Sequence, residues 1–148
     1  LRLVLAVSKI VRDLERIGDE LEKVGRLSLE SLDSADGVGI TEIQRIAEQV
    51  AKMLSESLTA FARLDLNLAR DIFERERKVD KVYQSALRSL ATFMIEDPRN
   101  IGSVLNIVWI ARSLERVGDH ATNIAEYVIY LVQGVDVRHP SVNENSFT

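Results

Sequence analysis

A five-residue motif occurs twice in this chain, on two stretches whose apolar residues recur with helical spacing. Glu15-Arg16-Ile17-Gly18-Asp19 is nearly repeated by Glu115-Arg116-Val117-Gly118-Asp119, at an offset of 115 − 15 = 100 positions. The match extends to the N-terminal side of the motif, where five more residues recur at the same offset: Val4, Leu5, Ile10, Arg12 and Leu14. Such a repeat is typical of a duplicated structural unit, so the chain is expected to hold parts of two helical repeats.

The composition favours an all-α protein with a buried core. Of the 148 residues, 46% are hydrophobic, only 5% are aromatic and two are proline, and these proportions favour helices over strands. Cysteine is absent, which excludes disulfides and thiolate metal sites and leaves oxygen or imidazole ligands for any metal. The net charge of −4, with arginines interleaved among acids, argues against a nucleic-acid partner.

The sequence shows neither a membrane span nor a secretion signal. No apolar run approaches the roughly 20 residues that a spanning helix needs, and the N-terminus lacks a basic segment followed by an apolar one. We therefore expect a soluble protein, and the absence of cysteine fits an intracellular one. Leu1 lies inside a helical pattern without a cap, which suggests that further sequence precedes it.

The spacing of apolar residues predicts four helices, of which the first two are separated by turn-forming residues. Residues 3–24 carry one apolar stripe at alternating spacings of four and three, and this helix is expected to end near Ser31. A second helix is expected to begin at Thr41, whose spacing to Gln44 is that of a capping box, and to end near residue 64.

Two further helices are predicted in the second half of the chain. The third covers about residues 68–95, with Asn67 as its expected cap. The Asp97-Pro98 pair should end it and start the fourth helix, because proline is tolerated at the first helical position. The fourth helix is expected to run to about Gln133 and to stop at Gly134.

Short connections make successive helices antiparallel neighbours, and this predicts the domain organisation. Residues 36–135 are expected to form an antiparallel three-helix bundle, and residues 1–35 the last helix of a preceding, truncated bundle. Residues 136–148 are expected to form a C-terminal tail. The apolar stripe of the first helix must be covered by upstream sequence or by another subunit, so a homodimer is one expectation.

Pairs of carboxylates on the third and fourth helices predict a metal site. Glu115 and Asp119 lie four residues apart and therefore project from one helix face. Glu76 and Asp80 have the same spacing, among apolar residues of the third helix. Because buried charges are costly unless paired or bound to metal, these four acids are expected to converge on a cation. Oxygen ligands suit iron, manganese, magnesium, calcium or zinc.

Other candidate ligands are weaker. The first helix carries Glu15 and Asp19, which have the same geometry but no partner helix within this chain. Asn123 and Glu126 extend the stripe of the fourth helix by one and two turns. The corresponding positions of the first helix hold basic residues, namely Lys23 and Arg26.

A simpler interpretation of the acids is also open, in which each forms a surface ion pair with an arginine three residues before it. The arginines concerned are Arg12, Arg16, Arg112 and Arg116. Among other residues, His120 is expected at the surface and His139 in the tail, while Trp109 and Tyr83 are expected to pack in the core.

At these residues the chain resembles the PhoU family. The resemblance is closest in Asp97-Pro98, in Leu105-Asn106-Ile107, in the stretch from Leu114 to Glu126, and at Gly134. It extends over about residues 1–138. Members of the family carry tandem three-helix bundles and bind metal clusters through repeated acidic motifs, so the resemblance implies a PhoU-like fold and assigns metal binding to the carboxylate pairs described above.

The resemblance also implies a function. It indicates a cytoplasmic regulator of phosphate uptake and of phosphate-starvation signalling, which acts as an adaptor between the ATPase subunit of a phosphate ABC transporter and a sensor histidine kinase. Its cofactor would be a multinuclear iron or zinc cluster, with manganese or magnesium possible. Such a protein would meet the membrane only through its partners.

Two other functions remain open from the residues alone. A structural helical dimerisation module would need no metal. A di-metal carboxylate enzyme would typically need a Glu-x-x-His pair, and neither Glu115 nor Glu126 is followed by histidine at that distance. The chain also lacks a glycine-rich phosphate loop, and we expect it not to be an enzyme.

Overall fold

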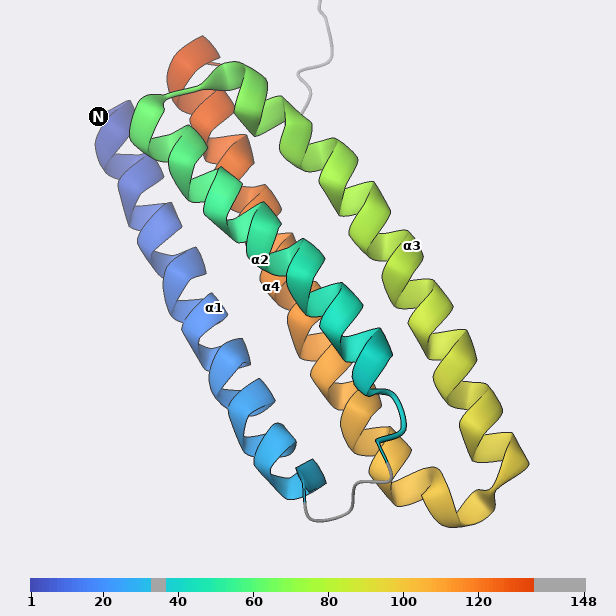
Figure 1. The fold of residues 1–148 in the computed structure, drawn as a ribbon. Coiled ribbons are helices and arrows are strands. Elements are labelled where there is room, and N and C mark those ends of the chain that lie inside the picture. Colours follow the sequence, from blue (N-terminus) through green and yellow to red (C-terminus); the bar gives the residue numbers. More distant parts are fainter. Residues whose placement is uncertain (33–36, 135–148) are drawn as a thin grey trace, which may run out of the picture.

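Four long helices make up the described part of the chain, residues 1–32 and 37–134, in a computed structural model. They are α1 (Arg2–Leu32), α2 (Ile40–Arg63), α3 (Leu66–Glu96) and α4 (Ile101–Gln133), with a short 3-10 helix, η1 (Pro98–Asn100), between the last two (Figure 1). No strand occurs among these residues. The predicted all-α class is therefore confirmed, whereas the expected tail and His139 lie outside the described residues.

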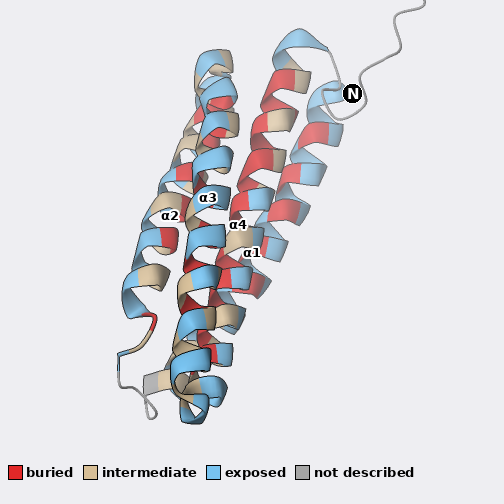
Figure 2. Cartoon of the chain, turned by 90° about the vertical axis from the view of Figure 1, so that its right-hand side faces the viewer, coloured by how far each residue is buried: buried red, intermediate tan, exposed pale blue. Residues whose placement is uncertain are grey.

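The helices alternate in direction, and α4 lies among the other three (Figure 1). α2, α3 and α4 contact one another, while α1 contacts α4 and no other described helix. This is the PhoU-like arrangement expected from the sequence: a three-helix bundle with one additional helix against its last member. Figure 2 shows the buried residues gathered on the inner sides of the helices.

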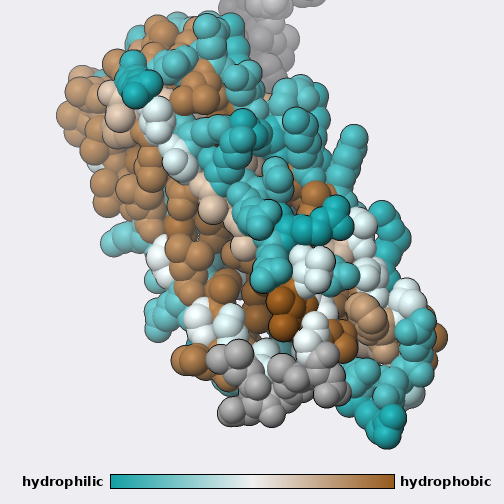
Figure 3. All heavy atoms as spheres, in the orientation of Figure 1, coloured by the Kyte–Doolittle hydropathy of each residue, from teal (hydrophilic) through white to brown (hydrophobic). Residues whose placement is uncertain are grey.

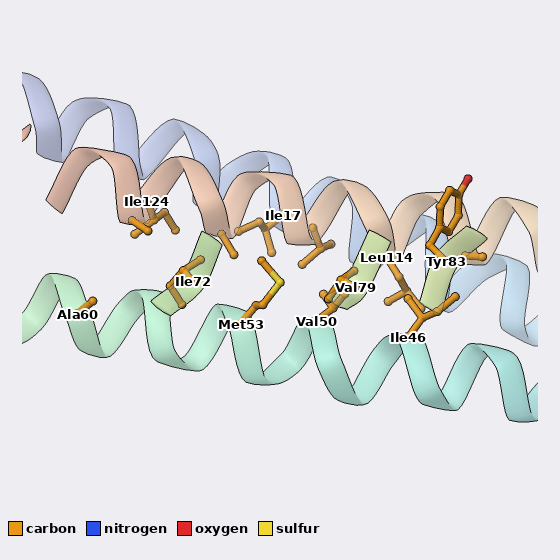
Figure 4. Packing of buried hydrophobic residues seen from close by; sticks show 14 of the residues in the cluster. Ile17, Ile46, Val50, Met53, Ala60, Ile72, Val79, Tyr83, Leu114 and Ile124 are labelled. Atoms are coloured by element: carbon orange, nitrogen blue, oxygen red, sulfur yellow. The ribbon is translucent and has the colours of Figure 1, made fainter. Parts of the chain in front are cut away.

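The core is built around α4, which carries more buried residues than any other helix. Figure 4 shows aliphatic side chains from α2 and α3 meeting those of α4, while Ile17 of α1 approaches α4 as well. Each fully buried aliphatic side chain contributes about 1.5–3 kcal/mol relative to its exposure to water. Besides Ile17, the buried residues labelled there are Ile46, Val50, Met53, Ala60, Ile72, Val79, Tyr83, Leu114 and Ile124.

Two expected helix caps are wrong. α2 begins after Gly39, whose φ of 81° is left-handed, and no side chain caps it, so the box of Thr41 and Gln44 does not form. A Cβ at Gly39 would lie 2.7 Å from Ile107 and 2.8 Å from Leu90, so close packing favours glycine here. α3 is capped by Asp65, which accepts a hydrogen bond from Leu68 N at 3.0 Å, instead of by Asn67.

The apolar stripe predicted on α1 divides between two environments. Ile10 and Ile17 are buried, whereas Leu3, Val7 and Leu14 are exposed. Figure 3 shows apolar side chains gathered over α1. Val4, Val11 and Leu21 are exposed too. At the offset of 100, the α4 positions equivalent to Val4, Val7, Val11, Leu14 and Leu21 are buried, because α2 and α3 cover that side of the helix; they are Val104, Ile107, Ala111, Leu114 and Ala121. The exposed face of α1 thus matches the face of α4 that receives two helices.

We expect the isolated 148-residue chain to self-associate through this apolar face of α1. Leu14→Lys should weaken association by about tenfold or more, because it removes roughly 1.5–3 kcal/mol of side-chain burial from the contact. Sedimentation equilibrium of both proteins measures the effect, with Ile95→Lys on the exposed end of α3 as the matched control. A wild-type chain that remains monomeric at high concentration contradicts the prediction.

Candidate metal centre

The four strongest candidate ligands lie on two adjacent helices and line one cavity. α3 supplies Glu76 and Asp80, and α4 supplies Glu115 and Asp119. The cavity has a volume of about 310 Å³, and its remaining lining is Met53, Arg77, Val79 and Gly118. The antiparallel contact of α3 and α4 therefore brings together two acid pairs that are about 40 residues apart in the sequence.

The cavity is open to water, which corrects one expectation. Glu76 and Glu115 are half-buried, but Asp80 and Asp119 are exposed. Asp80 directly follows the buried Val79 in α3 and is itself exposed. Water therefore solvates part of this charge, and desolvation alone does not require a bound cation.

Burial, and after it repulsion from neighbouring carboxylates, raises the pKa values of the two acids on α4. Burial raises the pKa of Glu115, and the nearby charges of Asp119 and Asp80 raise it further, against a lowering by Arg112. Burial also raises the pKa of Asp119, although its exposed surface makes this desolvation partial; Glu115 donates a hydrogen bond that lowers it, and the charge of Glu76 raises it. Negative charge from both helices is thus concentrated at this cavity.

The pKa of Glu76, on α3, is raised as well. Burial raises the pKa of Glu76, the Thr122 hydroxyl lowers it, and the charges of Glu115 and Asp80 raise it again. Thr122 is buried, and the dipole of its nearby hydroxyl is what lowers the pKa of Glu76. A cation placed among these oxygens would lower all of the raised pKa values.

The acids share a cavity without meeting at one point within it. Across residues 1–32 and 37–134, no three His, Cys, Asp or Glu side chains stand close enough together to hold a single ion. The carboxylates are borne on flexible side chains, and rotamers of exposed side chains interconvert in picoseconds to nanoseconds. Coordination would therefore require rotation about side-chain bonds, with the helices left in place.

Two weaker candidates lie elsewhere. Asn123 Nδ2 donates a hydrogen bond to Asp13 Oδ1 at 3.0 Å, so this amide belongs to the contact between α1 and α4. Glu126 is half-buried on α4 and does not line the carboxylate cavity. Neither residue lines the cavity formed by the four acids.

The half-site of the first repeat has mixed charge. Glu15 and Asp19 are both exposed on α1. Asp19 lines a second cavity of about 360 Å³, but Glu15 does not. The rest of that lining is Arg16, Glu20, Glu22, Lys23 and Arg26. Its three cations make it a poorer site for a metal than the cavity between α3 and α4.

Two buried acids that sequence reasoning missed join α1 to α4. Asp13 is only 6% exposed, and its Oδ1 lies 2.7 Å from His120 Nδ1. Glu20 is 8% exposed and pairs with Lys23 at 3.2 Å and with Arg116 at 3.5 Å. The pKa of Glu20 is lowered: burial raises it, but Lys23, Ser113 and Arg116 together lower it more. Both acids continue the spacing of three and four residues that marks the buried stripe of α1, and this spacing could have revealed them in the sequence. The stripe consists of Ala6, Ile10, Asp13, Ile17 and Glu20.

Other expectations about charged and aromatic residues need correction. No described ion pair joins an arginine of the duplicated motif to the acid three residues after it; Arg116 pairs with Glu20 instead. The side chain of His120 is only 24% exposed, so it is an interface residue rather than a surface one. Trp109 is 58% exposed, which contradicts its expected place in the core, whereas Tyr83 is buried as predicted.

Comparison with known proteins identifies the family to which this fold and sequence belong. The PhoU domain matches residues 43–128, which is more than half of the chain. The chain belongs to the PhoU family. A PhoU homologue from Pseudomonas aeruginosa, named a phosphate-specific transport system accessory protein, is 54% identical over 140 residues, with 94% of this chain and 58% of the relative covered.

A further relative and a solved structure agree. The accessory protein PhoU of Escherichia coli K12 is 40% identical over 144 residues, covering 97% of this chain and 60% of the relative. The crystal structure of PhoU from Pseudomonas aeruginosa superimposes with a TM-score of 0.88 at 52% identity, covering 91% of this chain and 65% of that one. The chain thus spans less than two thirds of each of these relatives. None of its described helices is long and apolar enough to cross a bilayer.

We expect Glu115→Gln to stabilise the metal-free protein at neutral pH. The change removes repulsion between Glu115 and Asp119, worth roughly 0.2–0.5 kcal/mol for a pair at this spacing, and repulsion from the acids of α3 in addition. A carboxyl whose pKa is raised on folding makes the folded protein less stable as the pH rises from the pKa of the unfolded state through the pKa of the folded state. The gain should therefore grow between about pH 4 and pH 7, the range above the ordinary glutamate pKa.

Urea unfolding in the presence of a chelator measures this gain. Glu15→Gln is the matched control, since it removes an acid with the same spacing to Asp19 but without acids from a second helix. Equal gains for the two variants would show that the acids of α3 and α4 do not interact.

Proposed function

We propose that this chain belongs to a metal-binding regulator of phosphate uptake and phosphate-starvation signalling. In this role it acts in the cytoplasm as a non-enzymatic adaptor between a phosphate ABC transporter, through its ATPase subunit, and a sensor histidine kinase. Membership of the PhoU family supports the proposal, as do the relatives named as accessory proteins of the phosphate-specific transport system.

The observation that carries the metal-binding part is the concentration of four carboxylates around one cavity. Glu76, Asp80, Glu115 and Asp119 come from two helices whose packing holds their backbones in register. Three of these acids have a raised pKa, first because of burial and then because neighbouring carboxylates repel their charge. The donor set consists of oxygen alone and suits iron, zinc, manganese or magnesium, in one ion or in a cluster.

We expect metal content to depend on the α4 pair. Glu115→Ala with Asp119→Ala should remove bound metal, whereas Glu15→Ala with Asp19→Ala, the equivalent pair on α1, should leave most of it. Elemental analysis after loading and desalting measures the content. Metal at 100 times its dissociation constant should also stabilise the wild-type fold by about 2.7 kcal/mol.

Unchanged metal content in the α4 double variant would contradict the proposed site. It would favour the second candidate, a structural helical dimerisation module, for which the exposed apolar face of α1 is the specific supporting observation. Sedimentation of the metal-free protein separates the two, because such a module would dimerise without any metal.

The adaptor role is tested by direct binding. Purified transporter ATPase subunit and the cytoplasmic part of the kinase should each retain this chain in a pull-down, and metal loading should change the amount retained. The α4 double variant should behave as the chelated wild type does. Loss of both interactions under every metal and phosphate condition would contradict the adaptor role while leaving the metal site standing.

A further inference from the structure

The outward face of α4 near its N-terminus combines apolar and basic side chains. Its exposed positions between residues 101 and 116 hold no acid; they are Ile101, Gly102, Leu105, Trp109, Arg112 and Arg116. We call these residues the Trp109 face. They recur at spacings of three and four and therefore lie along one side of the helix. An exposed tryptophan with arginines one and two turns away has the composition of protein–protein interface centres.

A preceding helical repeat would not cover this face. The contact between α1 and α4 has approximate two-fold symmetry. Asp13 contacts His120, and Glu20 contacts Ser113. At the offset of 100, Asp13 is equivalent to Ser113 and Glu20 to His120, so the two contacts are related to each other. At the same offset, Trp109 of α4 is equivalent to Lys9 of α1. Lys9 is exposed even though α2 and α3 pack on α4, the helix opposite it. By symmetry, two helices of a preceding repeat that packed on α1 in the same way would leave Trp109 exposed.

A second copy of the chain is also a poor occupant. A two-fold contact through the Trp109 face would bring Arg112 and Arg116 of one copy against the same patch of the other. Like charges in an interface oppose association. The occupant that fits must supply an apolar pocket for the indole ring and negative charge for the arginines.

The two arginines have donors available for carboxylates. Arg112 forms no salt bridge among the described residues, although its guanidinium donates a hydrogen bond to Tyr83 and is attracted by the charges of Glu115 and Asp119. Arg116 has one salt bridge, at 3.5 Å, to Glu20. A guanidinium carries five N–H donors and binds a carboxylate in bidentate fashion. Arg116 lies seven residues from Trp109, which is about 10 Å along a helix. Carboxylates one and two turns from an apolar anchor on a partner would match this spacing.

We propose that the Trp109 face is a docking surface for an acidic segment of a different protein, which buries Trp109 and pairs carboxylates with Arg112 and Arg116. The proposal deepens the adaptor function proposed above by assigning a surface and a partner chemistry. It does not depend on which protein supplies the segment.

The experiment places a photo-crosslinking amino acid at position 109 of the chain, in cells, and identifies the cross-linked peptide by mass spectrometry. The expected product is a peptide of another protein with at least two acidic residues near the cross-link. Arg112→Glu should lower its yield about tenfold or more, since it places like charges in contact, and Arg70→Glu, an exposed change on α3, should leave it unchanged. Changing the partner's acids to lysine should restore the yield with Arg112→Glu.

Charge-swap rescue distinguishes specific docking from capture of an abundant protein. Arg116→Gln serves as the second variant, and thermal unfolding checks that each variant is folded. A cross-link to a second copy of this chain, to lipid, or to a peptide without acids would overturn the proposal, as would absence of any product or of rescue. Persistence of the cross-link with Glu115→Ala and Asp119→Ala would separate this surface from the metal site.

The single tryptophan gives an independent readout with the purified components. With 5-fluorotryptophan in this chain, the fluorine resonance should shift when the synthetic cross-linked peptide is added, and the shift should be lost with Arg112→Glu. An unchanged resonance at saturating peptide would show that Trp109 is not buried by the segment and would overturn the proposal.

Discussion

Packing of three helices around α4 is the constraint on which the rest of this structure depends. Almost every side of α4 is used: α1, α2 and α3 each contact it, and its buried residues extend from Val104 to Ile129. Only a narrow outward strip remains for solvent. Any function carried by α4 must therefore lie along the edges of these three contacts, and both surfaces discussed above do so.

The carboxylate cavity shows the electrostatic consequence of that packing. Hydrophobic contact between α3 and α4 places Glu76 and Asp80 opposite Glu115 and Asp119, although their charges repel. The cost is moderate because two of the acids remain exposed to water. A cation among these oxygens would lower the repulsion between the carboxylates, and this is the electrostatic basis of the proposed metal site.

Polar contacts give the α1–α4 pairing its register. Apolar residues would let two long helices slide past one another by a turn at modest cost, but a buried carboxylate needs its partner at one position. The Asp13 carboxylate contacts His120 and accepts a hydrogen bond from Asn123, and Glu20 forms a salt bridge with Arg116. Meanwhile the face of α1 equivalent to the one that α2 and α3 cover on α4 stays exposed, with Val4, Val7 and Leu14 among its residues.

Local sequence determined the helices, because periodicity, glycine and Asp-Pro act over a few residues. It located all four helices, the stop at Gly134 and the two acid pairs of the cavity, since i,i+4 geometry is local. Only the tertiary structure decided which stripes face each other. Asp13 became buried, Trp109 and Asp80 became exposed, and Gly39 replaced Thr41 at a helix start, because each outcome depends on neighbours that are distant in the sequence.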